Sequence, residues 1–219
     1  MDKRQKLGLP RYTLGEELVN AISHGLGAAF GIVALVLCVV FSAKAGDAWM
    51  VVSSAIYGAS MIVLYSISTI YHALGINRAK RVFQILDHCS IYFLIAGTYT
   101  PYTLVAMRGP VGFTVFGIIW AAAACGITFN AISLKKFRVL SMVLYISMGW
   151  AVVFSAKTLF ASVPIVGIWL LVGGGVLYTV GAVLYGLGKT KKYMHSIFHF
   201  LALGGSVCHF ISIFAYVIL

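Results

Sequence analysis

The spacing of the charged residues is the feature that most constrains this chain, because it leaves seven long uncharged runs. Only 10% of the 219 residues are charged and 61% are hydrophobic, whereas a soluble domain is about 25% charged. The uncharged runs cover residues 18–43, 48–77, 88–107, 109–134, 139–156, 158–188 and 193–219. A helix needs roughly 20 apolar residues to cross a bilayer, so each run suits one crossing. This composition excludes an ordinary soluble enzyme and a disordered chain.

The sequence therefore predicts an all-α integral membrane protein, in which residues 1–219 form a single seven-transmembrane helix bundle. The runs are solidly apolar and do not alternate, which favours helices over a β-barrel. Their combined length leaves no room for a soluble domain. The expected spans are 18–42, 48–73, 85–106, 111–131, 138–157, 164–187 and 194–217.

The basic residues alternate between the two ends of such a bundle. Thirteen of the 16 Lys and Arg residues fall in the N-terminal tail and in the second, fourth and sixth loops, and three fall on the other side. The positive-inside rule then places the N-terminus in the cytoplasm and the C-terminus outside. We expect a multi-pass protein of the inner (plasma) membrane whose partner is membrane lipid. The net charge of +11 serves orientation, and no nucleic acid partner is expected.

Four ionisable residues from three different spans share one depth in this arrangement. His72 ends the second run, Asp87 begins the third, and His195 and His199 begin the seventh. All four lie within about two helical turns, roughly 10 Å, of the same basic face. Ionisable groups inside a membrane are costly, so such a gathering indicates a functional site.

The spacing of these residues suits a metal. His195 and His199 stand at i and i+4 on one helix face, which is good geometry for two ligands of one Zn²⁺, and His72 could supply a third nitrogen. Three histidines leave one tetrahedral position for water, whose pKa zinc lowers to about 7. No H-E-x-x-H motif is present, so Asp87 is the candidate base. Ser68 precedes His72 by one turn and could bind Asp87 or a substrate carbonyl.

A hydrogen-bonded polar cluster between helices remains the alternative to a metal site. Residues of the first span face the same side, as second-shell groups or as interfacial packing groups: Glu17, Asn20, Ser23 and His24. His88 points about 100° away from Asp87 around the helix, and we expect it to be structural. His209 lies about 15 Å deeper than His199, so it is expected to be a hydrogen-bonded core histidine.

As an ordered set, these motifs resemble the progestin and adipoQ receptor superfamily, and within it the bacterial haemolysin III branch. The resemblance is carried by Glu17-x-x-Asn20-x-x-Ser23-His24, Ser68-Thr69-Ile70-Tyr71-His72, Asp87-His88-Cys89-Ser90-Ile91-Tyr92, Ala96-Gly97-Thr98-Tyr99-Thr100-Pro101 and His195-x-x-x-His199. It implies a seven-helix bundle with a cytoplasmic N-terminus. It also implies zinc held by His72, His195 and His199, with Asp87 acting through water. Receptor members and the related alkaline ceramidases suggest hydrolysis of lipid amides, and the bacterial branch is linked to membrane-lipid homeostasis.

Several functions compete on this sequence. The first is a membrane-embedded zinc-dependent hydrolase-like protein acting on a lipid amide or ester. The second is a non-catalytic protein of lipid homeostasis or sensing, in which zinc staples three helices. A haemolysin-type cytolysin is third, although continuous apolar spans argue for an integral membrane protein. A retinal pump is disfavoured because the last run holds no lysine for a Schiff base. We favour the first.

Overall fold

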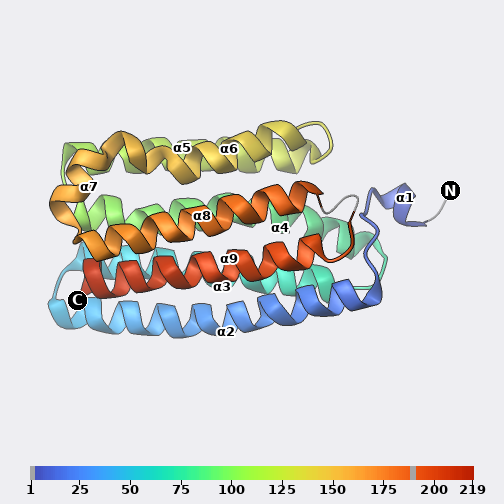
Figure 1. Cartoon of the computed structure of the whole chain (residues 1–219), viewed down its shortest axis with the longest axis horizontal. Helices are drawn as coiled ribbons and strands as arrows, with labels where there is room; N and C mark the ends of the chain where they lie inside the picture. Colours follow the sequence, from blue (N-terminus) through green and yellow to red (C-terminus); the bar gives the residue numbers. More distant parts are fainter. Residues whose placement is uncertain (1–2, 188–190) are drawn as a thin grey trace.

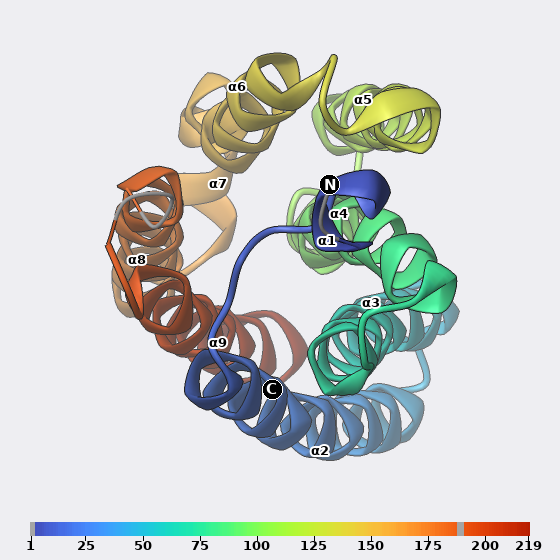
Figure 2. The ribbon, with the colours of Figure 1, turned by 90° about the vertical axis from the view of Figure 1, so that its right-hand side faces the viewer.

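The computed structural model describes residues 3–187 and 191–219, and within these ranges the chain is helical, with no strand. The long helices run along one axis (Figure 1) and form a bundle in end view (Figure 2). The α-helices are α1 (Lys3–Leu7), α2 (Leu14–Ala45), α3 (Ala48–Ala73), α4 (Arg78–Pro101), α5 (Pro110–Ser133), α6 (Arg138–Trp150), α7 (Ala156–Ser162), α8 (Ile165–Leu187) and α9 (Met194–Ile213).

Short polar segments set where the long helices begin and end. Thr13 caps α2 through a capping box with Glu16, whose carboxylate accepts hydrogen bonds from the backbone N–H and the hydroxyl of Thr13. Gly46 ends α2 in the left-handed conformation, with φ of 72°. Asp47 and Asn77 then cap α3 and α4. The chain therefore reverses direction within a few residues between these helices.

The two termini lie at opposite ends of the bundle (Figure 1). The N-terminal tail shares its end with the α3–α4 and α5–α6 connections, so these basic segments gather at one end as the charge pattern predicts. We call this the basic end. The structure contains no membrane, so the direction of insertion stays a prediction.

Six of the described segments are long and apolar enough to cross a membrane. The predicted span 85–106 is not among them. It falls on α4, whose first ten residues include Arg78, Lys80, Arg81 and Asp87, and on the π-helix η1 (Tyr102–Ala106) that continues α4. Twelve of the 24 residues of α4 are buried, against five of 24 in α5. α4 can be more polar because protein, not lipid, surrounds much of it.

Two other spans, each predicted as one continuous helix, consist of helices of more than one type in the structure. The span 138–157 covers α6, the 3-10 helix η2 (Ala151–Ser155) and the start of α7. The span 194–217 covers α9 and the π-helix η3 (Phe214–Ile218). Apolar runs do not reveal such changes of helix type, because the side chains remain apolar throughout.

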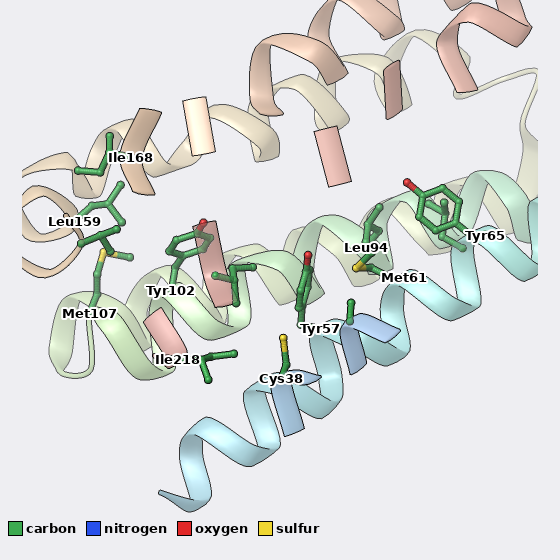
Figure 3. Packing of buried hydrophobic residues seen from close by; sticks show 14 residues of the cluster. Cys38, Tyr57, Met61, Tyr65, Leu94, Tyr102, Met107, Leu159, Ile168 and Ile218 are labelled. Atoms are coloured by element: carbon green, nitrogen blue, oxygen red, sulfur yellow. The ribbon is translucent and has the colours of Figure 1, made fainter. Parts of the chain in front are cut away.

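The main core cluster extends from beside the histidines toward the end of the bundle opposite the basic end. Tyr57, Met61 and Tyr65 of α3 are at most 1% exposed and pack with Leu94 and Tyr102 (Figure 3). Close contact between α8 and α9 depends on glycine. A Cβ on Gly174 would lie 2.4 Å from a ring carbon of His209, and a Cβ on Gly205 would lie 2.7 Å from the Tyr178 ring. These glycines therefore allow α8 and α9 to pack closely.

Candidate metal centre

The three predicted metal ligands meet near the basic end of the bundle. His72 lies in the last turn of α3, and His195 and His199 occupy successive turns at the start of α9. The beginning of α9 is tied to α2, because the Tyr193 N–H donates to Glu16 Oε1 over 2.8 Å. All three histidines are at most 6% exposed. Counting helical depth along the sequence thus correctly predicted that they share one level.

Their Nε2 atoms converge on one point. His195 Nε2 lies 3.3 Å from His72 Nε2 and 3.1 Å from His199 Nε2, and one ligand atom of each residue lies within 4.8 Å of the others. Two nitrogens on a tetrahedral zinc, each about 2.0–2.1 Å from the ion, stand roughly 3.3–3.4 Å apart. The spacing around His195 is therefore close to that of a tetrahedral metal site.

Hydrogen bonds between the three rings would satisfy the converging nitrogens less well than a bound metal cation would. A hydrogen on His195 Nε2 can serve only one of its two short contacts, because a neutral imidazole carries one hydrogen. The Nδ1 atoms of His195 and His199 are buried and have no hydrogen-bond partner among the described residues. The converging Nε2 atoms have only one another as close partners, and it is these atoms that call for a ligand. A cation between the rings would accept all three lone pairs.

Glu17 orients the first of these rings. The His72 Nδ1–H donates to Glu17 Oε2 over 2.7 Å, and Lys80 Nζ lies 2.8 Å from Glu17 Oε1. With its proton on Nδ1, the neutral His72 ring presents a bare Nε2 to the cluster. This carboxylate–histidine pairing is the usual outer arrangement around metal ligands. Of the two expected roles for Glu17, supporting a metal ligand fits the structure better than packing at the membrane interface.

The rest of the α2 motif lies beside the cluster. The His24 ring stacks on His199 with 3.6 Å between centroids and 19° between planes, and both His24 nitrogens are buried without a described partner. Asn20 Nδ2 lies 3.5 Å from His72 Nδ1. Ser23 Oγ donates to the Asn20 carbonyl, which makes it a packing residue of α2.

Asp87 and Ser68 face a cavity of about 180 Å³ that also touches His24, His195 and His199. The cavity continues between α4, α6, α8 and α9 to Trp150 and His209, and its walls are mainly apolar. Ser68 Oγ is buried and makes no hydrogen bond to any described residue, so the expected Ser68–Asp87 bond is not formed. The second expected partner, a substrate carbonyl, remains open to Ser68.

His88 and His209 both make the hydrogen bonds of a structural residue. His209 Nε2 lies 3.0 Å from the Leu171 carbonyl oxygen, which confirms the predicted hydrogen bond, and the residue is half-buried beside the cavity. His88 Nδ1 lies 2.9 Å from the Gln84 carbonyl oxygen and its Nε2 lies 3.2 Å from the Tyr185 hydroxyl, in keeping with the expected structural role. His88 Nδ1 lies 3.8 Å from Asp87 Oδ2, and both residues line the cavity. A helix angle of 100° separates Cβ directions, but long side chains can still converge.

Tyr12 covers the cluster, although no sequence pattern marked it as a site residue. The segment that joins α1 to α2 crosses the basic end of the bundle (Figure 2). Within it, the Tyr12 ring stacks on His195 with centroids 4.9 Å apart and 13° between planes, and Arg4 Nη1 donates to the Tyr12 carbonyl over 2.9 Å. Burial raises the pKa of Tyr12 well above its ordinary value, so its hydroxyl stays neutral. No periodicity marks a residue outside the helices.

The sequence of this chain matches a known protein family. Residues 12–210 match the family model described as "Haemolysin-III related". The chain belongs to the haemolysin-III-related family. It is 42% identical over 205 residues to a protein named "Hemolysin-3 homolog" of Bacillus subtilis, covering 94% of this chain and 96% of the relative. It is 41% identical over 203 residues to "Hemolysin-3" of Bacillus cereus, covering 93% and 92%.

A more distant relative supports the wider superfamily. The human "Monocyte to macrophage differentiation factor" is 26% identical over 211 residues, covering 93% of this chain and 85% of the relative. The predicted resemblance to the haemolysin III branch, and to the superfamily that contains it, is therefore confirmed. The chain is a multi-pass membrane protein of the haemolysin-III-related family. These names mention no metal and no substrate, so the chemistry of the site rests on its geometry.

Proposed function

We propose that this haemolysin-III-related protein is a membrane-embedded, zinc-dependent hydrolase-like protein that acts on a lipid amide or ester. One observation carries the proposal: three buried Nε2 atoms converge beside a mainly apolar cavity that also exposes a carboxylate. Imidazole nitrogens in this number and spacing suit zinc, and three protein ligands leave a coordination position open. The apolar walls suit an acyl chain.

The proposal includes a membrane arrangement. α4, continued by η1, is the seventh crossing, with the N-terminus in the cytoplasm, the C-terminus outside, and the protein in the plasma (inner) membrane. The gathering of the basic tail and basic connections at one end supports this orientation. Burial of α4 among other helices supports its crossing despite Arg78, Lys80, Arg81 and Asp87. The histidine cluster then lies in the cytoplasmic half of the membrane.

Each group near the cluster has a role in this chemistry. Zinc, when bound, supplies Lewis-acid character and lowers the pKa of a water molecule to about 7. Asp87, on the cavity wall, would be the group that orients a water molecule there and accepts its proton. Ser68, whose hydroxyl is free among the described residues, donates a hydrogen bond to the substrate carbonyl. Glu17 holds His72 in the tautomer that presents a bare Nε2 to the centre.

A zinc staple without turnover is the second candidate function. Its supporting observation is that the cluster joins α3 to α9, with His24 of α2 stacked on His199. A metal there would join α3 directly to α9, with α2 held against them by the stacking of His24, in keeping with a role in lipid homeostasis or sensing. The same residues serve both candidates, so only turnover separates them. A cytolysin is the weakest candidate, because the apolar helices suit permanent residence in a membrane.

Two measurements test the proposal. The purified protein should carry about one zinc per chain by mass spectrometry of its metal content, and no zinc would contradict both candidates. Membranes of cells with the wild-type protein should then be compared by lipidomics with membranes containing Asp87→Ala. If the variant folds and holds zinc yet leaves every lipid species at its wild-type level, the protein is a staple and not a hydrolase.

A further inference from the structure

The carboxylate of Glu16, in the first turn of α2, has no role in the function proposed above, although it binds groups close to the histidine cluster. Its Oε1 accepts a hydrogen bond from the backbone N–H of Tyr193, which is 2.8 Å away and 177 residues later in the chain. Its Oε2 accepts from the N–H and the hydroxyl of Thr13, over 2.9 and 2.8 Å. Glu16 is 5% exposed. A buried carboxylate thus joins the first turn of α2 to the residue that precedes α9.

This bond holds Tyr193 in a conformation that its own side chain disfavours. Tyr193 is the N-cap of α9, with φ of 61° and ψ of 0°, and no other non-glycine residue in the described part of the chain has a positive φ. A Cβ makes this left-handed conformation unfavourable, whereas glycine adopts it freely. A hydrogen bond to a carboxylate is among the stronger ones in proteins. The bond to Glu16 therefore offsets the strain at Tyr193.

The φ angle of Tyr193 affects where the first turn of α9 lies relative to α2. The N–Cα bond of Tyr193 joins the N–H that binds Glu16 to the part of the chain that begins α9, where the Tyr193 carbonyl accepts from the Ile197 N–H over 2.9 Å. His195 follows two residues after Tyr193, and His199 lies one turn further on. Metal ligands must stay within about 0.5 Å of their working positions. A small change of φ is therefore enough to misplace these two rings.

We propose that Glu16 is a positioning residue, which sets the places of His195 and His199 by holding Tyr193 in the left-handed conformation. The inference rests on the metal centre of the proposed function and adds a residue that acts through the backbone and not through a ligand ring. The next residue, Glu17, binds the His72 ring directly. Two consecutive carboxylates of α2 thus hold the two helices that supply the ligands, α3 through a side chain and α9 through the backbone that precedes it.

Metal binding by variants tests this proposal. Glu16→Ala should weaken zinc binding about 10-fold to 100-fold in competition with a chelating dye, as the loss of a group that supports a metal ligand does. The same variant loaded with Co²⁺ should have an altered visible spectrum, because that spectrum depends on coordination geometry. Thr13→Ala is the matched control. It removes a hydroxyl that binds Glu16 and lowers thermal stability, but it leaves the Tyr193 bond, so zinc affinity and the Co²⁺ spectrum should stay unchanged.

A second substitution, Tyr193→Gly, separates positioning from a general effect on stability. Glycine reaches the left-handed conformation without strain, so it depends less on the bond to Glu16. In the Glu16→Ala protein, Tyr193→Gly should therefore recover about fivefold or more of the lost zinc affinity. A Glu16 that only caps α2 predicts no such recovery. Glu16→Gln keeps one acceptor oxygen, so it should show a smaller loss, and it replaces Glu16→Ala if that variant does not fold.

Amide hydrogen exchange in metal-free protein tests the same bond without zinc. The Ile197 N–H, which is bound to the Tyr193 carbonyl, should exchange about tenfold faster in Glu16→Ala than in wild-type protein or Thr13→Ala. Unchanged exchange, an unchanged zinc affinity and Co²⁺ spectrum in Glu16→Ala, or no recovery with Tyr193→Gly would overturn the inference alone. If wild-type protein binds no zinc, the metal centre of the proposed function fails instead, and the exchange rate of Ile197 still decides whether Glu16 holds the start of α9.

Discussion

The last helix carries histidines in both of its halves, and the two halves hold them differently. His209 is bound through Nε2 to a carbonyl of α8 and fits against Gly174. His195 and His199 instead point their Nε2 atoms at each other and at His72, and their Nδ1 atoms have no partner among the described residues. A paired histidine needs no ligand, whereas converging unpaired nitrogens do. The partners of the ring nitrogens therefore distinguish a structural histidine from a metal ligand.

The largest expected effect is on metal content, and it should follow this division. His195→Ala or His199→Ala should weaken zinc binding by more than about 100-fold, since even outer-shell partners contribute about 10- to 100-fold. Zinc per chain after dialysis should fall from about one to near zero. His209→Ala is the matched control on the same helix and should keep its zinc. Normal zinc in both cluster variants would refute the site.

The next effect concerns the carboxylate behind His72. Glu17→Gln keeps a side chain of the same shape but removes its charge, so His72 becomes a weaker ligand. Zinc affinity, measured by competition with a chelating dye, should fall about 10-fold to 100-fold. Asp47→Asn removes a carboxylate at the other end of α2 and should not change the affinity. An unchanged affinity in Glu17→Gln would make its bond to His72 merely structural.

Substitutions that disturb the half of α9 around His209 should lower the stability of the protein without changing its zinc content. Gly174→Ala places a methyl group 2.4 Å from the His209 ring, so it should destabilise the protein by at least about 1 kcal/mol. A Cβ on Gly173 meets nothing within 4 Å, which makes Gly173→Ala the control. Thermal melting in detergent should show a lower midpoint for Gly174→Ala alone. Equal midpoints would show that the α8–α9 contact is looser than described.

The smallest effect should come from Asp47, at the end of the bundle away from the cluster. The Arg108 guanidinium, 2.6 Å away, and the N–H groups of Trp49 and Met50 hold the pKa of Asp47 below its ordinary value. A lowered pKa stabilises the fold above the unfolded pKa, and that contribution is lost as the pH falls below about 4. Metal-free wild-type protein should therefore lose slightly more thermal stability between pH 5 and 3 than Asp47→Asn. Parallel losses would show that the pair contributes nothing.

Sequence spacing predicted the levels of the cluster well, because helical rise converts residue number into height. Spacing could not predict how each helix is rotated about its own axis or how far each side chain extends. Ser68 therefore lacks the bond to Asp87 that was one of its two expected bonds, and the His88 side chain reaches within 3.8 Å of Asp87 although the two Cβ directions differ. The start of the third expected span at residue 85 is also late by comparison with α4, which begins at Arg78. The basic residues that were assigned to the second loop belong to α4, and one of them, Lys80, is buried against Glu17.

The contact between Tyr12 and His195 has a consequence for biogenesis. The segment that crosses the basic end leaves the ribosome before the helix that it covers. It can dock only after α9 has been inserted and packed against α8, so the histidines are assembled before they are covered. During that interval the cluster is open to the cytoplasm in the proposed orientation, and ions can enter without displacing a folded segment. A segment that is synthesised before α9 is thus the last to close over the centre.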